Sequence, residues 1–193
     1  KTYYRSSNDS MQFNYNGLTH FSSSERLFPR VFVEKLGFKN HGNRSLYNKG
    51  NTSFNDAFLG VKYLLTQDQT TKKPYSFLFE DNNIKVYKNP FALPIGIGID
   101  KNIINYELNS KVIDPFKNQE QLAEYMSGEK KGDLFKYLEP TEIHKENLTE
   151  TKLSDSVRYT KVDKTKESYV SFKVKIPNNN SIYAYFASSP KNP

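Results

Sequence analysis

Aromatic residues recur on a period of two over residues 75–79, which open the segment 75–87. Tyr75, Phe77 and Phe79 recur at every second position, which predicts a strand with these three rings on one face. Residues 81–83, Asp-Asn-Asn, supply turn chemistry, and the four residues after them are again rich in strand formers. The pattern predicts a β-hairpin over this segment.

Two short helices are expected before the hairpin. Residues 29–36 read as a helix that ends at Gly37, because glycine readily takes the left-handed conformation that follows a helix. Ser53, with Asp56 three residues later, resembles a capping box. It predicts a helix of one or two turns that stops at Gly60.

Residues 91–99 form the longest apolar run, interrupted only by Pro94, Gly96 and Gly98. Crossing a bilayer takes about 20 apolar residues, so this run is too short to span one. Its composition predicts a buried extended segment at the centre of the core.

The pattern after residue 100 is mostly that of strands. Asn118 can cap a helix over residues 119–126, and strands are expected at 157–162, 168–176 and 182–187. The fold class is therefore α+β, with a mixed sheet and short helices over 1–99 and a mostly antiparallel β portion over 100–193. Three or four strands make only a partial sandwich, so this second portion packs on the first or is truncated.

Composition supports a folded chain and adds a charge signal. Of the 193 residues, 15% are aromatic, which argues against disorder, and there is no cysteine. The net charge is +7, and residues 1–99 account for +6 of it, with 13 basic and 7 acidic side chains. Such an excess would favour phosphate-rich partners, but the default explanation is a solvated surface with a modest excess of lysine. No nucleic-acid-binding motif accompanies the charge, so nucleic acid is not expected as a partner.

Candidate catalytic and metal-binding residues are few. The histidines His20, His41 and His144 have neither the helical spacing nor the neighbouring ligands of a metal site. The serines at 22–24 fit turn and capping roles, and Gly96-Ile97-Gly98 lacks the rest of a dinucleotide fingerprint. We therefore expect no catalytic residue, no metal and no cofactor in this chain.

Several phrases, read in order, resemble the extracellular region of the YfhO family of bacterial membrane proteins. These phrases cover roughly residues 12–95. The more specific ones are residues 55–65, 84–89 and 92–94. The phrases are Gly17-Leu18-Thr19-His20-Phe21-Ser22-Ser23, Lys35-Leu36-Gly37-Phe38, Asn55-Asp56-Ala57-Phe58-Leu59-Gly60-Val61-Lys62-Tyr63-Leu64-Leu65, Ile84-Lys85-Val86-Tyr87-Lys88-Asn89 and Ala92-Leu93-Pro94.

The resemblance implies a parent protein similar to GT-C glycosyltransferases. Such a parent has a membrane domain of many helices and a domain outside the membrane, and it takes sugars from a polyprenyl-phosphate carrier. Family members are linked to the glycosylation of teichoic acids in Gram-positive envelopes. The catalytic carboxylates of that class lie on early loops between membrane helices, so the resemblance implies that this chain is an extracellular piece that is non-catalytic by itself.

Lys62 and Tyr63 are the candidate binding residues, because they lie in the most distinctive phrase. The expected partners are an anionic cell-envelope glycopolymer or lipid headgroups, together with the parent's own transmembrane domain. The structural alternative for Lys62 is a partly buried strand residue whose ammonium group reaches water.

Two other function classes stay open at this point. One is a passive platform for a partner membrane protein, and the other is a free-standing carbohydrate-binding module. Salt-sensitive binding of a teichoic acid separates acceptor recognition from the passive platform, and hydrophobic segments flanking the chain separate a tethered domain from a free one.

Overall fold

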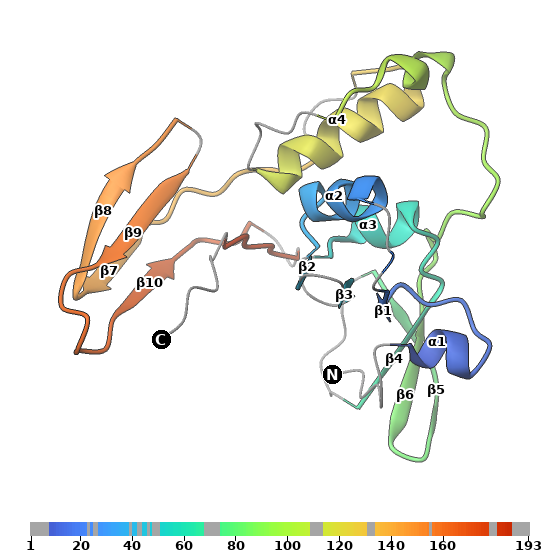
Figure 1. The fold of residues 1–193 in the computed structure, drawn as a ribbon, viewed down its shortest axis with the longest axis horizontal. Helices are drawn as coiled ribbons and strands as arrows, with labels where there is room; N and C mark the ends of the chain where they lie inside the picture. The colour runs from blue at the N-terminus through green and yellow to red at the C-terminus, as the bar shows by residue number, and fades with distance from the viewer. Residues whose placement is uncertain are drawn as a thin grey trace. The chain divides into compact units, whose positions relative to one another are not determined.

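A computed structural model describes residues 8–22, 24, 27–38, 40–41, 44–45, 47, 51–67, 74–108, 114–130, 134–154, 156–177 and 181–186. The chain forms two compact units (Figure 1). The first comprises Lys1–Lys130 and Tyr183–Pro193, and the second comprises Lys131–Ile182. The boundary expected at residues 99 and 100 falls inside the first unit. Short helices and antiparallel sheets confirm the α+β class.

The first unit combines short helices with two small sheets. Its helices are α1 (Asp9–Gln12), α2 (Leu27–Lys35), α3 (Ser53–Phe58), the 3-10 helix η1 (Lys101–Asn105) and α4 (Pro115–Ser127). One sheet has the strand order β1-β3-β2, from His20–Phe21, Arg44–Ser45 and Asn40–His41. The other has the order β4-β6-β5, from Tyr63–Thr66, Ile84–Lys88 and Ser76–Asp81.

Helix α2 ends as the sequence predicted. Gly37 has φ 98°, in the left-handed region, and its N–H donates to the carbonyl of Glu34. The N–H of Phe38 reaches back to the carbonyl of Val33, which completes the usual cap of this kind. The Phe38 side chain is buried, so the cap also delivers an apolar ring to the core.

The N-terminal caps of α3 and α4 differ from the expected ones. Thr52, not Ser53, caps α3, and its hydroxyl accepts a hydrogen bond from the Asn55 N–H at 3.2 Å. Asp114, not Asn118, caps α4 by accepting from the Phe116 N–H at 2.9 Å. In both cases another oxygen-bearing side chain just upstream is positioned to serve the first turn.

The core of the first unit lies where α2, α3 and α4 meet. Leu36, Phe38 and Leu122 are buried there, and partly buried side chains surround them. Aromatic contacts join the elements, with 6.1 Å between the ring centroids of Phe32 in α2 and Phe58 in α3. The surrounding side chains are Phe32, Val33, Tyr47, Phe54, Phe58, Leu59, Ile103, Tyr106 and Met126.

The hairpin predicted over residues 75–87 is confirmed as β5 and β6. Asn82 and Asn83 at its turn both have positive φ, as tight hairpin turns require. The prediction that Phe77 and Phe79 share a face is wrong. The register shifts between them, so Phe77 pairs with Tyr87 and Phe79 pairs with Val86. Neighbouring residues of β6 point to opposite faces, and the bulge therefore places the two rings on opposite faces.

The prediction that residues 91–99 are buried at the centre of the core is also wrong. Figure 1 shows this segment leaving β6 and running outside the helices to η1. Phe91, Ile97 and Ile99 are exposed, and Ile95 is fully exposed. The core space is filled instead by side chains of α2, α3 and α4.

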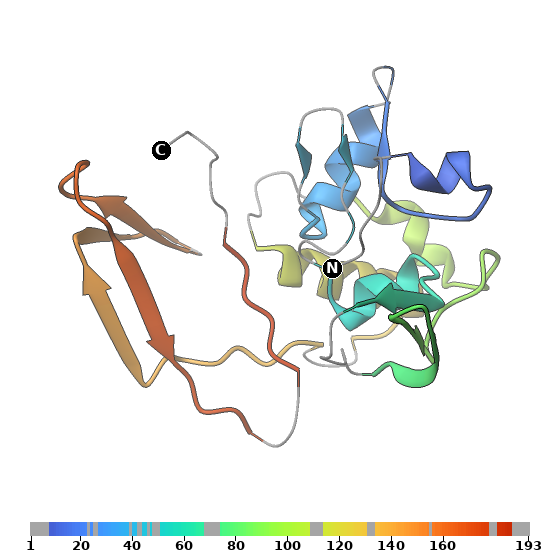
Figure 2. The ribbon, with the colours of Figure 1, turned by 90° about the horizontal axis from the view of Figure 1, so that it is seen from below.

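The second unit consists of two pairs of antiparallel strands (Figures 1 and 2). Strand β7 (Glu142–Glu146) pairs with β10 (Tyr169–Lys173), and β8 (Leu148–Lys152) pairs with β9 (Val157–Lys161). The rings of Tyr159 and Phe172 meet edge to face at 6.1 Å between centroids and join the two pairs. Residues 181–186 contain no strand, contrary to the expectation for residues 182–187.

Within the described ranges, none of the helices has both the length and the apolar character needed to cross a membrane.

Candidate functional site

The segment from Thr52 to Thr66 contains both a buried polar framework and an exposed basic surface. It begins at the cap of α3, turns at Gly60 and continues as β4. Gly60 has φ 66°, and a Cβ added to it would lie 3.0 Å from the carbonyl oxygen of Leu93. Glycine is therefore required at residue 60, between the buried polar residues of α3 and the exposed residues at the start of β4.

Asp56 is the centre of the framework. It is completely buried, and its carboxylate accepts hydrogen bonds from the Tyr47 hydroxyl at 3.0 Å, the Asn51 amide at 2.9 Å and the Tyr75 hydroxyl at 2.9 Å. Tyr47 and Asn51 precede α3 in the chain, and Tyr75 directly precedes β5. A charged acceptor shared by three donors holds these segments together strongly.

The two phenols that face Asp56 are held in the protonated form. Burial raises the pKa of Tyr47, and the negative charge of Asp56 raises it further. The same two causes, in the same order, raise the pKa of Tyr75. Both hydroxyls therefore remain hydrogen-bond donors to the carboxylate.

A second set of buried amides joins the end of α2 to α3 and α4. The carbonyl of Leu36 accepts from the side-chain amides of Asn55 and Gln119, at 2.8 Å each, and the carbonyl of Lys35 accepts from Asn118 at 2.9 Å. The last carbonyls of a helix lack partners within it, so these amides supply what α2 requires. Asn55 and Asp56, which open the distinctive phrase, thus have structural roles.

Lys62 and Tyr63 lie at the exposed end of the same segment. The Lys62 ammonium is 5.6 Å from the centroid of the Tyr63 ring, within reach of a cation–π contact. Both side chains are exposed, the tyrosine by 48%. Their backbone is fixed to the end of β6, because the Asn89 N–H donates to the Lys62 carbonyl at 2.9 Å and the Asn89 amide donates to the Val61 carbonyl at 3.0 Å.

The sheet adds Lys88 to these two residues. Lys88 of β6 is the cross-strand partner of Tyr63 of β4 and is also exposed. Directly paired residues have side chains on the same face of a sheet, so the side chains of Lys88 and Tyr63 project from the same face. We call Lys62, Tyr63 and Lys88 the basic aromatic surface.

Sequence reasoning did not single out Lys88 as a site residue. Its phrase, Ile84 to Asn89, was noted for the family resemblance, but only the register of β4 against β6 pairs it with Tyr63. A strand alignment of these two segments is the signal that would have found it.

The geometry favours binding over catalysis. An exposed aromatic ring offers a flat apolar face to a sugar ring, and the flanking ammonium groups attract phosphate. Within the part of the chain that the structure covers, no group of three or more His, Asp or Glu side chains is arranged to hold a metal ion.

Comparison with protein-family models matches the whole chain, residues 1–193, to the family described as bacterial membrane protein YfhO. The chain belongs to the YfhO family. Searches among curated proteins and among solved structures give no significant match. The family assignment extends the resemblance seen in residues 12–95 to the full length, and makes this chain part of a membrane-associated protein.

Proposed function

We propose that this YfhO-family chain is an extracellular domain of a polytopic, glycosyltransferase-like membrane protein, and that it recognises an anionic glycopolymer acceptor of the teichoic-acid type. The chain binds and orients the acceptor, while sugar transfer from a polyprenyl-phosphate donor takes place in the parent's membrane domain. The basic aromatic surface is the observation that carries the proposal.

The chemistry of that surface matches a polymer of alternating sugar and phosphate. Lys62 lies over the Tyr63 ring, and Lys88 adds a second positive charge on the same face of the sheet as Tyr63. A phosphate between two lysines and a sugar or polyol on the ring would use both features at once. Because the lysines are exposed, each contact is weak and screened by salt, and affinity comes from repeated units along the polymer.

The test is titration of the chain with purified teichoic acid, measured by calorimetry at low and at high salt. We expect binding that weakens as salt rises. The Lys62→Gln/Lys88→Gln double variant should bind about tenfold or more weakly, because two charge-assisted contacts are lost.

The control is Lys85→Gln, which removes one positive charge from β6, the strand that also carries Lys88. Lys85 pairs with Thr66 and Glu80 and lies three positions from Lys88, so its side chain is on the other face of the sheet. The control should bind like the unchanged chain. Absence of salt-sensitive binding, or equal losses in Lys85→Gln and the double variant, would refute the proposal and favour the passive platform.

A further inference from the structure

Residues 94–99, with the sequence Pro-Ile-Gly-Ile-Gly-Ile, form an exposed apolar loop that we call the apolar strap. Ile95 is 102% exposed, and Ile97 and Ile99 are exposed by 38% and 43%. A Cβ built on Gly96 or Gly98 meets no atom within 4 Å. The strap therefore exposes all three of its isoleucines, Ile95 completely and the other two in part.

Both ends of the apolar strap are fastened to helices. At the start, the Leu93 N–H donates to the Ala57 carbonyl of α3 at 3.0 Å. At the end, the Asp100 N–H donates to the Met126 carbonyl of α4 at 2.9 Å, and its carboxylate accepts from the Asn102 N–H at 2.8 Å. The exposed isoleucines are thus held on a loop with two fixed bases.

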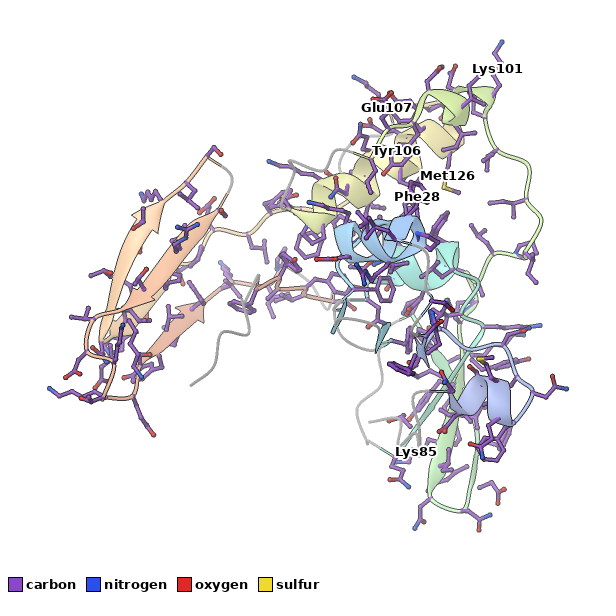
Figure 3. The ribbon with its side chains drawn as sticks, in the orientation of Figure 1. Phe28, Lys85, Lys101, Tyr106, Glu107 and Met126 are labelled. Atoms are coloured by element: carbon purple, nitrogen blue, oxygen red, sulfur yellow. The ribbon has the colours of Figure 1, made fainter. Side chains whose placement is uncertain are left out.

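The charged residues that flank the apolar strap in sequence suit an anionic surface. Residues 89–99 contain no charged side chain, whereas Lys88 precedes them and Lys101 follows them, both exposed. Figure 3 shows the Lys101 side chain extending away from η1. Asp100, the acidic residue that directly follows the strap in sequence, is partly buried and caps η1.

We propose that the apolar strap inserts its isoleucines into the interfacial layer of an anionic lipid bilayer, with Lys88 and Lys101 on the headgroups. The combination of apolar side chains and flanking cations is that of an interfacial anchor. The exposed backbone at Gly96 and Gly98 keeps the insertion shallow, since unpaired peptide groups do not enter the hydrocarbon core. This inference rests on the membrane association of the family and does not require that the chain bind a glycopolymer.

The chain contains no tryptophan, so a single introduced tryptophan reports on one position. The test places it in the strap as Ile95→Trp and mixes the chain with vesicles of phosphatidylcholine and phosphatidylglycerol. We expect a blue shift of the emission and quenching by brominated lipids. Val162→Trp is the matched control, at an exposed apolar position of the second unit, and should show neither change.

Two further variants measure the contributions of the isoleucines and of the charge. Ile95→Ser/Ile97→Ser should lower partitioning into the mixed vesicles by about tenfold or more in a sedimentation assay. Lys101→Gln should lower it about fivefold, and should have no effect with vesicles of phosphatidylcholine alone. Both replace exposed side chains, so the melting temperature should be unchanged.

An unshifted Ile95→Trp spectrum, an equal shift in Val162→Trp, or partitioning that survives the double serine variant would each overturn the inference. The vesicles contain no glycopolymer and the polymer titration contains no lipid, so either proposal can fail without the other.

Discussion

Asp56 joins three separate side-chain donors of the first unit through one carboxylate. Its carboxylate has no exposure, and three side-chain donors converge on it. Two of these donors are phenols, and removing the carboxylate takes away the charged acceptor that both share. A buried donor left unpaired costs far more than an average hydrogen bond contributes.

We therefore expect Asp56→Ala to lower the free energy of unfolding by about 3 kcal/mol or more. Urea denaturation followed by circular dichroism measures the change. Asp81→Asn is the control, because Asp81 is exposed at the end of β5, and its effect should stay within about 0.5 kcal/mol. A loss below about 1 kcal/mol for Asp56→Ala would mean that the three donors find other partners.

At the scale of elements, the junction between α3 and β4 depends on a glycine that no other residue replaces without strain. Gly60 combines a positive φ with a close approach to the Leu93 carbonyl. The N–H of Leu93 also donates to the Ala57 carbonyl of α3, and this bond holds the first end of the apolar strap. One backbone position thus affects the framework, the start of β4 and the base of the strap.

Gly60→Ala should destabilise the chain by about 1–2 kcal/mol, because the left-handed conformation is unfavourable for alanine and its Cβ comes close to the Leu93 carbonyl. Gly96→Ala is the matched comparison. Its added Cβ meets nothing and its φ is not in the left-handed region, so stability should be unchanged or up to about 1 kcal/mol higher. Thermal unfolding of both variants checks the contrast, and equal effects would contradict it.

The elements that sequence alone predicted are those with local signals. The turn residues between β5 and β6 and the glycine after α2 act within a few residues, and both predictions were confirmed. The prediction that residues 91–99 are buried was wrong, because the apolar character of a segment does not show which other elements cover it.

The buried polar residues could not be predicted because their partners are distant in sequence. Gln119 and Asn118 each bond a carbonyl 83 residues away, and no local pattern marks such a pair. Lys62 and Tyr63 were selected through the family resemblance alone, and Lys88 joined them only through the strand register.

At the scale of the whole molecule, stability should depend on pH on the alkaline side. The native pKa values of Tyr47 and Tyr75 lie above the value of about 10 expected in the unfolded chain. Above pH 10 the unfolded chain releases protons that the native chain keeps. The stabilisation by these tyrosines is therefore complete below pH 10 and is lost as pH rises beyond it.

Each of these two tyrosines should contribute about 1.4 kcal/mol of lost stability per pH unit above about pH 10. Tyr75→Phe should make the fall less steep by that amount, and Tyr47→Phe/Tyr75→Phe by twice as much, although both variants start from a lower stability at neutral pH. Urea unfolding at a series of pH values measures the slopes. Identical slopes in all three chains would show that the phenols ionise in the native state as they do in the unfolded one.

The return of the chain to the first unit has a consequence for how the sequence can change. After the second unit, Tyr183 bonds both the N–H of Ser53, at 3.2 Å, and its hydroxyl, at 2.8 Å, at the first turn of α3. The second unit is therefore an insertion, because the residues before it and the residues after it both belong to the first unit. Hairpins of the second unit can therefore lengthen, shorten or be exchanged during evolution while the contacts within the first unit are kept.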